Sequence, residues 1–280
     1  MKILGTGLTG LVGSRIVEFL TEFEFDISQE DITDRNLIQD RIEKSDAQVV
    51  LHLAAKTDVD GCEKDKDFGE KGDAWRINVI GTENVALACK QSSKKLIYIS
   101  TDFVFDGEKV GSYEEDDSPN PINWYGKTKF EGEKKVQNLC KNYIIARIAY
   151  PYRKSFIKKD LVRVLIEKIE AGESLKMVTD HIMVPTFIDD IASALKLLIK
   201  NDERGVFHVV GSQAITPYDT AILISDIYGF SKSNIAKTTR EEFFKGRAKR
   251  GYNLSLKNDK IEKLGIQMRT LDQGIREIKG

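Results

Sequence analysis

A tyrosine and a lysine lie four positions apart in the segment WYGKTK, residues 124–129. If this segment is helical, Tyr125 and Lys129 share one face and lie one turn apart. A free tyrosine has a pKa of about 10 and is a poor acid at neutral pH, so an adjacent ammonium that favours the phenolate would make it a usable proton donor. Solvated surface pairs have the same spacing, so other motifs must decide its meaning.

A glycine-rich turn near the N-terminus supplies the first of these motifs. Three glycines with the spacing GxxGxxG follow an apolar strand and open an amphipathic helix. Glycines permit a tight turn and let backbone N–H groups approach a pyrophosphate, which the positive end of the helix also favours. A purely structural turn is the alternative, but the strand–turn–helix setting favours dinucleotide binding. The predicted cofactor-binding residues of this turn are Gly7, Leu8, Thr9, Gly10, Leu11 and Val12.

An acidic residue after the second predicted strand bears on the choice of dinucleotide. Asp26 lies 19 residues after Gly7 and is expected to end that strand. An acid there accepts hydrogen bonds from the adenosine ribose 2′-OH and repels a 2′-phosphate, so the sequence slightly favours NAD(H) over NADP(H). The alternative is a loop aspartate before a turn. Asp31 and Ile32 follow in a loop and could contact the adenine, although Asp31 could equally be a helix N-cap.

Two buried strands end in residues that suit a ligand crevice. Leu53, Ala54 and Ala55 end the strand 49–53, and small residues there let a flat ligand approach the backbone, although they could also simply pack. Thr101 and Asp102 follow the strand 95–100. Hydroxyl groups at the carboxyl end of a parallel strand face the crevice, so Thr101 could donate to a substrate carbonyl beside Tyr125; a Ser/Thr turn is the alternative.

The elements that must position these residues alternate in type. Short apolar runs and amphipathic stretches follow one another through the first half of the chain, which is typical of βαβ units around a parallel sheet. We therefore predict an α/β fold with a doubly wound parallel sheet of the Rossmann type. The dinucleotide-binding domain is expected over 1–148 and a smaller C-terminal substrate-binding region over 149–280, with about 186–210 returning to the sheet. A single helix is predicted over 75–91, and the tail after residue 216 is predicted to be mostly helical.

Composition excludes several classes of function. The 280 residues carry 43 basic and 44 acidic side chains, so no net field attracts nucleic acid or an anionic membrane. Three widely spaced cysteines make neither a disulfide framework nor a zinc site, and we expect free thiols in a reducing cytoplasm. The acidic run 114–117 is read as a solvated loop, and no metal is assigned. The sequence allows a homodimer.

Together the motifs resemble the extended short-chain dehydrogenase/reductases, and more closely the dTDP-4-dehydrorhamnose reductases. The specific segments are STDFVFDG at 100–107 and YGKTK at 125–129, and the likeness extends to PT at 185–186 and NLSL at 253–256. It implies a nucleotide-sugar substrate and a nicotinamide cofactor. One departure concerns Tyr150, which stands where these reductases usually carry a tryptophan that packs on the sugar.

The resemblance implies a role for each matching residue. Tyr125 would donate a proton to the sugar C4 oxygen, Lys129 would hold the nicotinamide ribose and lower the pKa of Tyr125, and Thr101 would hydrogen-bond the reacting oxygen. Leu53, Ala54 and Ala55 would line the cofactor. Asp102 and Tyr150 would contact the sugar nucleotide. Arg250 is a candidate partner for the diphosphate, because guanidinium matches phosphate oxygens, or else a surface arginine.

Two alternatives remain open at this point. A sugar-nucleotide epimerase would use Thr101, Tyr125 and Lys129 as well, whereas a 4,6-dehydratase is disfavoured because Phe103 follows Asp102 in place of a glutamate. The chain is also similar to the regulatory β subunit of methionine adenosyltransferase, which would bind a dinucleotide and dock on a partner. A pure binding module does not need an intact Thr–Tyr–Lys set, so the sequence favours an enzyme.

Overall fold

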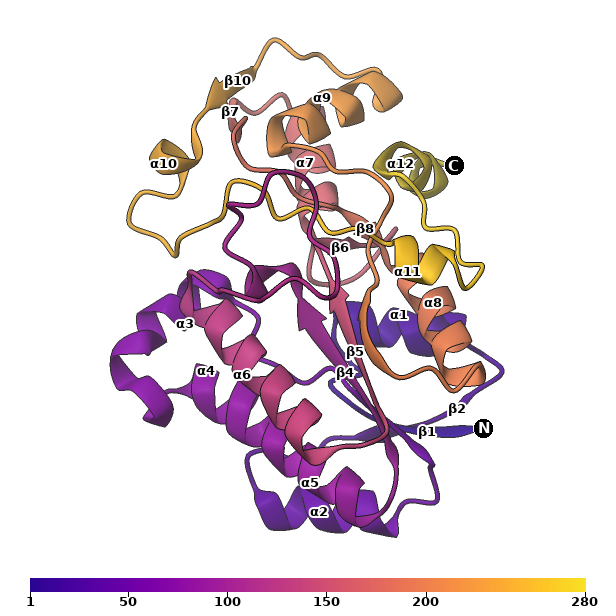
Figure 1. The fold of residues 1–280 in the computed structure, drawn as a ribbon. Helices are drawn as coiled ribbons and strands as arrows, with labels where there is room; N and C mark the ends of the chain where they lie inside the picture. Colours follow the sequence, from indigo (N-terminus) through magenta and orange to yellow (C-terminus); the bar gives the residue numbers. More distant parts are fainter.

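A six-stranded parallel sheet forms the centre of the protein, in a computed structural model that describes residues 1–280. The strand order is β2-β1-β3-β4-β5-β9, which is a doubly wound arrangement (Figure 1). The strands are β1 Lys2–Thr6, β2 Glu24–Ser28, β3 Val49–His52, β4 Lys95–Thr101, β5 Tyr143–Ile148, β6 Pro151–Tyr152, β7 Leu175–Val178, β8 Thr186–Phe187, β9 Gly205–His208 and β10 Ile235–Thr238.

Helices cover both faces of this sheet and build most of the C-terminal half. They are α1 Leu11–Phe19, α2 Arg35–Lys44, α3 Val59–Asp65, α4 Asp73–Trp75, α5 Thr82–Gln91, α6 Trp124–Leu139, α7 Leu161–Glu170, α8 Ile188–Lys200, α9 Pro217–Tyr228, α10 Arg240–Phe243, α11 Asp259–Glu262 and α12 Leu271–Lys279. The predicted Rossmann-type fold is confirmed. No helix of the chain has the length and hydropathy needed to cross a bilayer.

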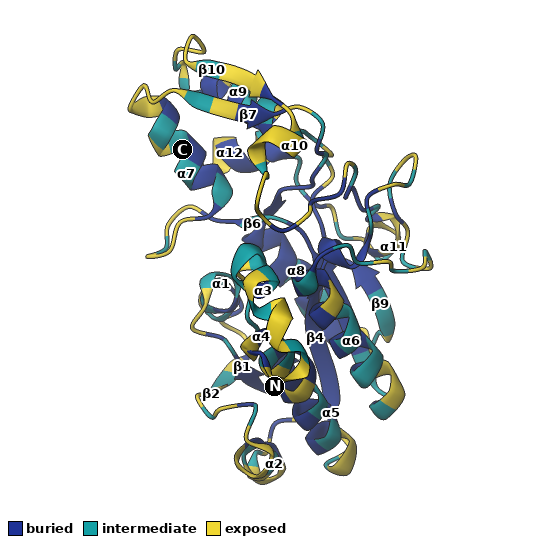
Figure 2. Cartoon of the chain, turned by 90° about the vertical axis from the view of Figure 1, so that its left-hand side faces the viewer, coloured by how far each residue is buried: buried dark blue, intermediate teal, exposed yellow.

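The central strands are unbroken apolar runs in the sequence because they lie inside the core. Strand β4 is buried along its whole length, as the dark blue ribbon in Figure 2 shows. Strands of a parallel sheet are covered on both faces, so alternation of polar and apolar residues disappears. One apolar cluster lies between the sheet and helices α1 and α8, and a second lies under α2, α5 and α6.

The C-terminal half packs around a third apolar cluster from α7, α9 and α12. Two small parallel sheets, β10-β7 and β6-β8, belong to this half of the molecule (Figure 1). Strands β7 and β10 were not predicted, and the tail expected to be mostly helical contains a strand at Ile235–Thr238. The return to the main sheet is made by α8 and β9, whereas β8 pairs with β6 instead.

Two predicted boundaries also differ near the site. The second strand runs on to Ser28 instead of ending at Asp26, because β2 pairs with β1 up to Thr6. The single helix expected over 75–91 is composite, with a π-helical turn at Arg76–Gly81 ahead of α5. Buried Asn78 lies in this turn, and its side-chain amide bonds to Lys56 and Thr128, which ties the loop after β3 to α6.

Candidate active site

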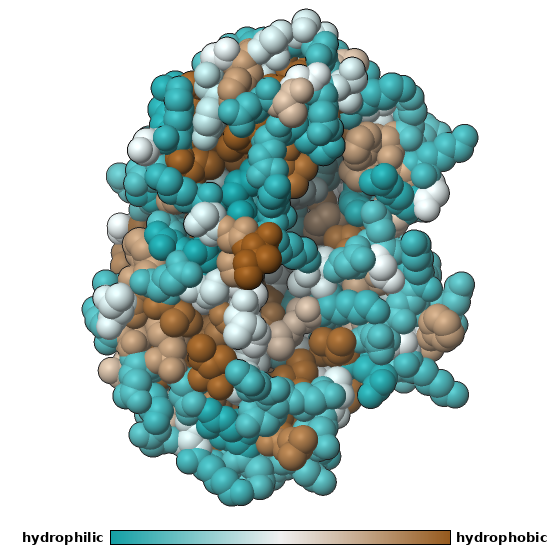
Figure 3. Space-filling view, turned by 180° about the vertical axis from the view of Figure 1, so that it is seen from behind, coloured by the Kyte–Doolittle hydropathy of each residue, from teal (hydrophilic) through white to brown (hydrophobic).

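A cleft of about 720 Å³ opens at the carboxyl ends of the sheet strands, where it faces the C-terminal half. Seen from behind, the surface is hollowed between the two halves, and apolar side chains border the hollow (Figure 3). Most of the predicted site residues line this one cleft: Gly7, Thr9, Gly10, Leu11, Val12, Leu53, Ala54, Ala55, Thr101, Asp102, Tyr125, Lys129 and Tyr150. The fold therefore brings together residues that the sequence places far apart.

The glycine turn has the geometry that close backbone approach requires. Gly7 has φ +71°, and a Cβ at this position would lie 2.5 Å from the Ala54 backbone nitrogen. Only glycine fits both conditions. Helix α1 begins directly after the turn with no side-chain cap, so its first N–H groups are left for a ligand. These features suit a dinucleotide pyrophosphate. The Leu8 side chain lies in the core, and contact of its backbone with the cofactor stays a prediction.

The acid that lies next to the glycine turn is Glu30 and not Asp26. Asp26 lies within β2 opposite Leu4, and its carboxylate pairs with Arg41 of α2. The residues next to the glycine turn are instead Ser28, at the end of β2, and Glu30, and both line a recess of about 400 Å³. The Ser28 hydroxyl donates to Glu30 at 2.5 Å and lowers the pKa of that carboxyl.

Asp31 and Ile32 lie outside the cleft. The Asp31 carboxylate accepts a 2.8 Å hydrogen bond from the Thr33 backbone, so it closes a local turn and does not cap α2. The N-cap of α2 is Asp34. Ile32 is buried in the core beneath Gly81. Contact of either residue with adenine stays a prediction.

Helix α6 places Tyr125 in its first turn. Asn123 caps the helix by accepting from the Gly126 backbone at 2.8 Å. Gly126 is needed because a Cβ there would lie 2.0 Å from the Phe103 carbonyl oxygen. This close approach brings α6 against the end of β4. The Tyr125 ring meets Phe103 edge-on at 5.8 Å, and burial raises the pKa of its phenol, whereas the neighbouring Thr101 hydroxyl lowers it.

Lys129 lies one turn further along, fully inside the protein. Its Nζ donates to the Ile99 carbonyl at 2.8 Å and lies 4.0 Å from the centre of the Tyr98 ring. Burial lowers the pKa of Lys129 to about 7, against a smaller raising effect from Glu133. The expected direct lowering of the Tyr125 pKa by Lys129 is not what this geometry gives, because the ammonium is directed at the β4 backbone.

Thr101 and Asp102 form a polar pair at the end of β4. The Thr101 hydroxyl donates to Asp102 Oδ1 at 2.8 Å and accepts from the Phe103 backbone. Asp102 Oδ2 is buried and has no hydrogen-bond partner, and the same holds for Ser100 Oγ. Burial raises the pKa of Asp102 to about 7. Orphaned buried acceptors are costly, so this end of the cleft suits a ligand with hydroxyl groups.

We expect Asp102→Asn to stabilise the protein in a pH-dependent way. Between pH about 4 and about 7 the folded protein keeps a proton on Asp102 that the unfolded chain releases, so wild-type stability falls across this window and levels off above it. The variant lacks this loss. Its advantage in unfolding free energy should be larger at pH 8 than at pH 4 by about 2–4 kcal/mol. Urea unfolding at pH 4, 6 and 8 measures this, and a constant difference would contradict it.

Tyr150 and Arg250 lie on the substrate side. Tyr150 lines the cleft, and its hydroxyl is 2.8 Å from His181 Nε2. The alternative of a surface arginine is wrong, because Arg250 is 8% exposed and donates to Asp60 Oδ1 at 3.0 Å. Its guanidinium lies 5.6 Å from the centre of the Phe103 ring. Arg250 lines a second hollow of about 650 Å³ that also contains Arg240, Arg247 and Lys249.

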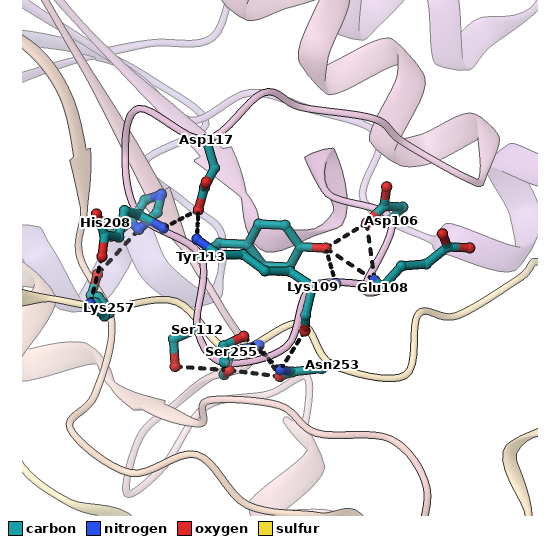
Figure 4. Close-up of polar contacts among 12 residues, drawn as sticks. Asp106, Glu108, Lys109, Ser112, Tyr113, Asp117, His208, Asn253, Ser255 and Lys257 are labelled. Carbon is teal, nitrogen blue, oxygen red and sulfur yellow. Dashed lines mark hydrogen bonds and ion pairs between the residues drawn. The ribbon is translucent and has the colours of Figure 1, made fainter.

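Polar contacts hold the loop after β4, and residues 114–117 within it are exposed or half-buried, which agrees with the predicted solvated loop. Tyr113 anchors it: the phenol oxygen accepts from the backbone of residues 107–109 and donates to Asp106 at 2.5 Å (Figure 4). Asp117 accepts from the Glu114 backbone, and Glu115 accepts from the backbone of His208 at 3.0 Å. Because Asp106 and Glu108 line the second hollow, the loop forms part of its wall.

Several residues near the cleft were missed by sequence reasoning. Glu30 and His181 belong to no sequence motif. Only the folded structure shows that they lie close to segments that are remote in the sequence. Phe156, Lys158 and Lys159 also line the cleft. Their one sequence signal was a basic pair in a stretch without clear periodicity.

Comparison with known proteins agrees with this geometry. The family model described as RmlD substrate binding domain matches residues 1–279. The chain is 30% identical to a dTDP-4-dehydrorhamnose reductase of Aggregatibacter actinomycetemcomitans, over 80% of this chain and 78% of that protein. It is 29% identical to methionine adenosyltransferase 2 subunit beta of Xenopus tropicalis, over 99% and 86%. The crystal structure of a Bacillus anthracis dTDP-4-dehydrorhamnose reductase in complex with NADP superimposes with a TM-score of 0.90 at 29% identity, over 99% and 98% of the two chains.

Proposed function

The chain belongs to the RmlD substrate binding domain family, and from this premise we propose that it reduces the 4-keto group of a nucleotide-linked deoxysugar with NAD(P)H. The substrate we assign is the one named for its reductase relatives, dTDP-4-dehydrorhamnose. The observation that carries the proposal is the convergence of Thr101, Tyr125 and Lys129 with the glycine turn on one cleft.

The chemistry requires a hydride donor, an acid and a group that polarises the carbonyl. Bound NAD(P)H would supply the hydride to C4 of the sugar. Tyr125 is the acid in our proposal: its phenol O–H bond breaks as the proton passes to the C4 oxygen, which becomes a hydroxyl. The Thr101 hydroxyl would donate to the same oxygen in place of its present acceptor, Asp102 Oδ1. Lys129 lines the same cleft and would hold the nicotinamide ribose.

We propose that the two parts of the chain divide the ligands between them. Residues 1–148 would bind the dinucleotide, and 149–280 would bind the sugar nucleotide. The buried Oδ2 of Asp102 supports placing sugar hydroxyl groups beside Thr101, since that atom has no partner in the protein. Around the second hollow four cations outnumber three carboxylates, which favours the diphosphate there. The Arg250 guanidinium also lies against Phe103, which lines the main cleft.

Oxidation of NADH and NADPH in the presence of dTDP-4-dehydro-6-deoxy-L-mannose tests the proposal. We expect sugar-dependent loss of the reduced nicotinamide absorbance with at least one cofactor. Dinucleotide binding without turnover on this sugar would contradict the proposed substrate.

A non-catalytic role is the second candidate, because the similarity to methionine adenosyltransferase 2 subunit beta covers 99% of the chain. The intact cleft of Thr101, Tyr125 and Lys129 argues for the enzyme. Capture of a catalytic partner together with absent turnover would instead favour the regulatory subunit.

Cofactor selectivity is expected to depend on Glu30 and not on Asp26. Glu30 lies beside the recess next to the glycine turn, and its carboxylate faces Arg41 at 3.6 Å. Glu30→Gln replaces the charged acceptor for the ribose 2′-OH with a neutral amide and removes the negative charge that repels a 2′-phosphate. The ratio of the NADPH Kd to the NADH Kd should fall about tenfold, as for loss of one charge-assisted hydrogen bond.

Titration of nicotinamide fluorescence measures both dissociation constants without any sugar. Asp26→Asn is the matched control, since it removes the other carboxylate that faces Arg41 but lies within β2. We expect it to leave the ratio within about twofold. If both variants change the Kd ratio equally, neither acid alone makes the ribose contact.

A further inference from the structure

His181 lies where three segments of the substrate side meet. It is 1% exposed and comes from the loop after β7. Its Nε2 is 2.8 Å from the Tyr150 hydroxyl, and its Nδ1 is 2.7 Å from the Gly251 carbonyl oxygen. Phe244 meets its ring edge-on at 6.3 Å. Tyr150 lines the main cleft, and Gly251 and Phe244 line the second hollow, so His181 connects the walls of both cavities.

The two contacts determine the tautomer of this histidine. A carbonyl oxygen can only accept, so Nδ1 must carry the proton that is donated to Gly251. In the neutral ring Nε2 is then an acceptor, and the Tyr150 hydroxyl must donate to it. Burial lowers the pKa of His181, and Arg250 and Arg240 act in the same direction against Asp180 and the Gly251 hydrogen bond. The proton of Tyr150 is therefore directed away from the cleft.

Tyr150 needs such a restraint, because its backbone conformation is unfavourable. It has φ +40°, in the left-handed region that bulky residues rarely adopt, and it precedes Pro151. Strained residues persist where surrounding contacts hold them. Here the Thr186 backbone donates to the Tyr150 carbonyl at 3.2 Å, and the ring lies 6.3 Å from Phe103 with a 37° tilt. The bond to His181 fixes the remaining end of the side chain.

We propose that His181 is a positioning residue for the sugar, which holds the Tyr150 ring as a flat platform in the cleft and links it to the segment 248–251. The inference rests on the proposed function in that the ligand facing Tyr150 is taken to be the sugar of the nucleotide. It gives the two tyrosines of the cleft different tasks. Tyr125 keeps its proton for the reacting oxygen, whereas the proton of Tyr150 is committed to His181.

The first test reads the tautomer directly and needs no turnover. The chain has only three histidines, so long-range proton–nitrogen correlation spectra of the imidazoles can be assigned with one variant, His181→Gln. We expect Nδ1 of His181 to be protonated and Nε2 unprotonated at pH 7.5, and Tyr150→Phe to shift the Nε2 resonance. A proton on Nε2, or no response to Tyr150→Phe, overturns the proposal.

The second test separates binding of the sugar nucleotide from chemistry. His181→Leu and Tyr150→Phe should each raise KM for dTDP-4-dehydro-6-deoxy-L-mannose about three- to tenfold, as for one lost hydrogen bond, and change kcat and the Kd of the cofactor by less than about twofold. His181→Gln should recover most of the loss, because its amide can donate and accept at once. The double variant His181→Leu/Tyr150→Phe should be no worse than either single one.

The outcomes distinguish this inference from the function on which it rests. Unchanged KM in both single variants, or fully additive losses in the double variant, overturns the positioning role while wild-type turnover upholds the reductase. If the wild-type protein does not turn over the sugar nucleotide, the proposed function is wrong, and so is the assignment of the sugar as the ligand of Tyr150. If His181→Leu does not fold, Tyr150→Phe and His181→Gln still test the positioning role.

Discussion

A Tyr125→Phe variant is expected to lose about 10³-fold or more in kcat while it binds the dinucleotide normally. General acid catalysis typically contributes about 10²–10⁴-fold, and phenylalanine has no proton to give to the C4 oxygen. The substitution keeps the ring and its edge-on contact with Phe103, so the start of α6 should stay in place. Steady-state kinetics with saturating sugar nucleotide, together with a cofactor titration, measure the two effects separately.

The cleft itself offers a control for this experiment. Tyr150→Phe removes the other phenol of the cleft, whose proton is directed to His181. Its effect should appear in KM, whereas that of Tyr125→Phe should appear in kcat. Full activity of Tyr125→Phe would remove Tyr125 from the mechanism, and equal kcat losses in both variants would point to packing of the cleft and not to proton donation.

The second large effect concerns stability. Arg147 of β5 and Glu133 of α6 form a bidentate ion pair with bonds of 3.0 and 2.8 Å, and their side chains are 3% and 1% exposed. Arg147 also lies 5.1 Å from the centre of the Phe105 ring. Glu133→Leu would leave the arginine charge buried without its partner. Removing one member of such a pair costs about 3–5 kcal/mol, which chemical denaturation can measure.

A double variant decides whether the unpaired charge causes the loss. Glu133→Leu/Arg147→Met removes both charges and keeps apolar volume between α6 and the sheet, so it should recover most of the stability, because paired buried charges often gain little over apolar packing. If the double variant is as unstable as Glu133→Leu, the cost lies in packing. If Glu133→Leu itself is within about 1 kcal/mol of wild type, the pair does not stabilise the fold.

The sequence by itself was sufficient for features that depend on neighbours along the chain. The glycine turn, the buried strands β1, β3, β4 and β5 and the helix that carries Tyr125 and Lys129 follow from local spacing and burial patterns. Because parallel strands end at one edge of a sheet, the convergence of Thr101 with the glycine turn could also be predicted. The short strands β6, β7 and β10 could not, since they are too short for a pattern.

Only the tertiary structure decided which side chains meet. Asp26 and Glu30 are both acids near the expected position, and the pairing of β1 with β2 leaves Glu30 beside the recess and gives Asp26 to Arg41. His181 joins segments that lie 31 and 70 residues away along the chain. Lys129 was expected to act on Tyr125, but burial against β4 directs its ammonium to Ile99. Periodicity reports which face of an element is buried, whereas the partner of a charged or polar group depends on packing between distant segments.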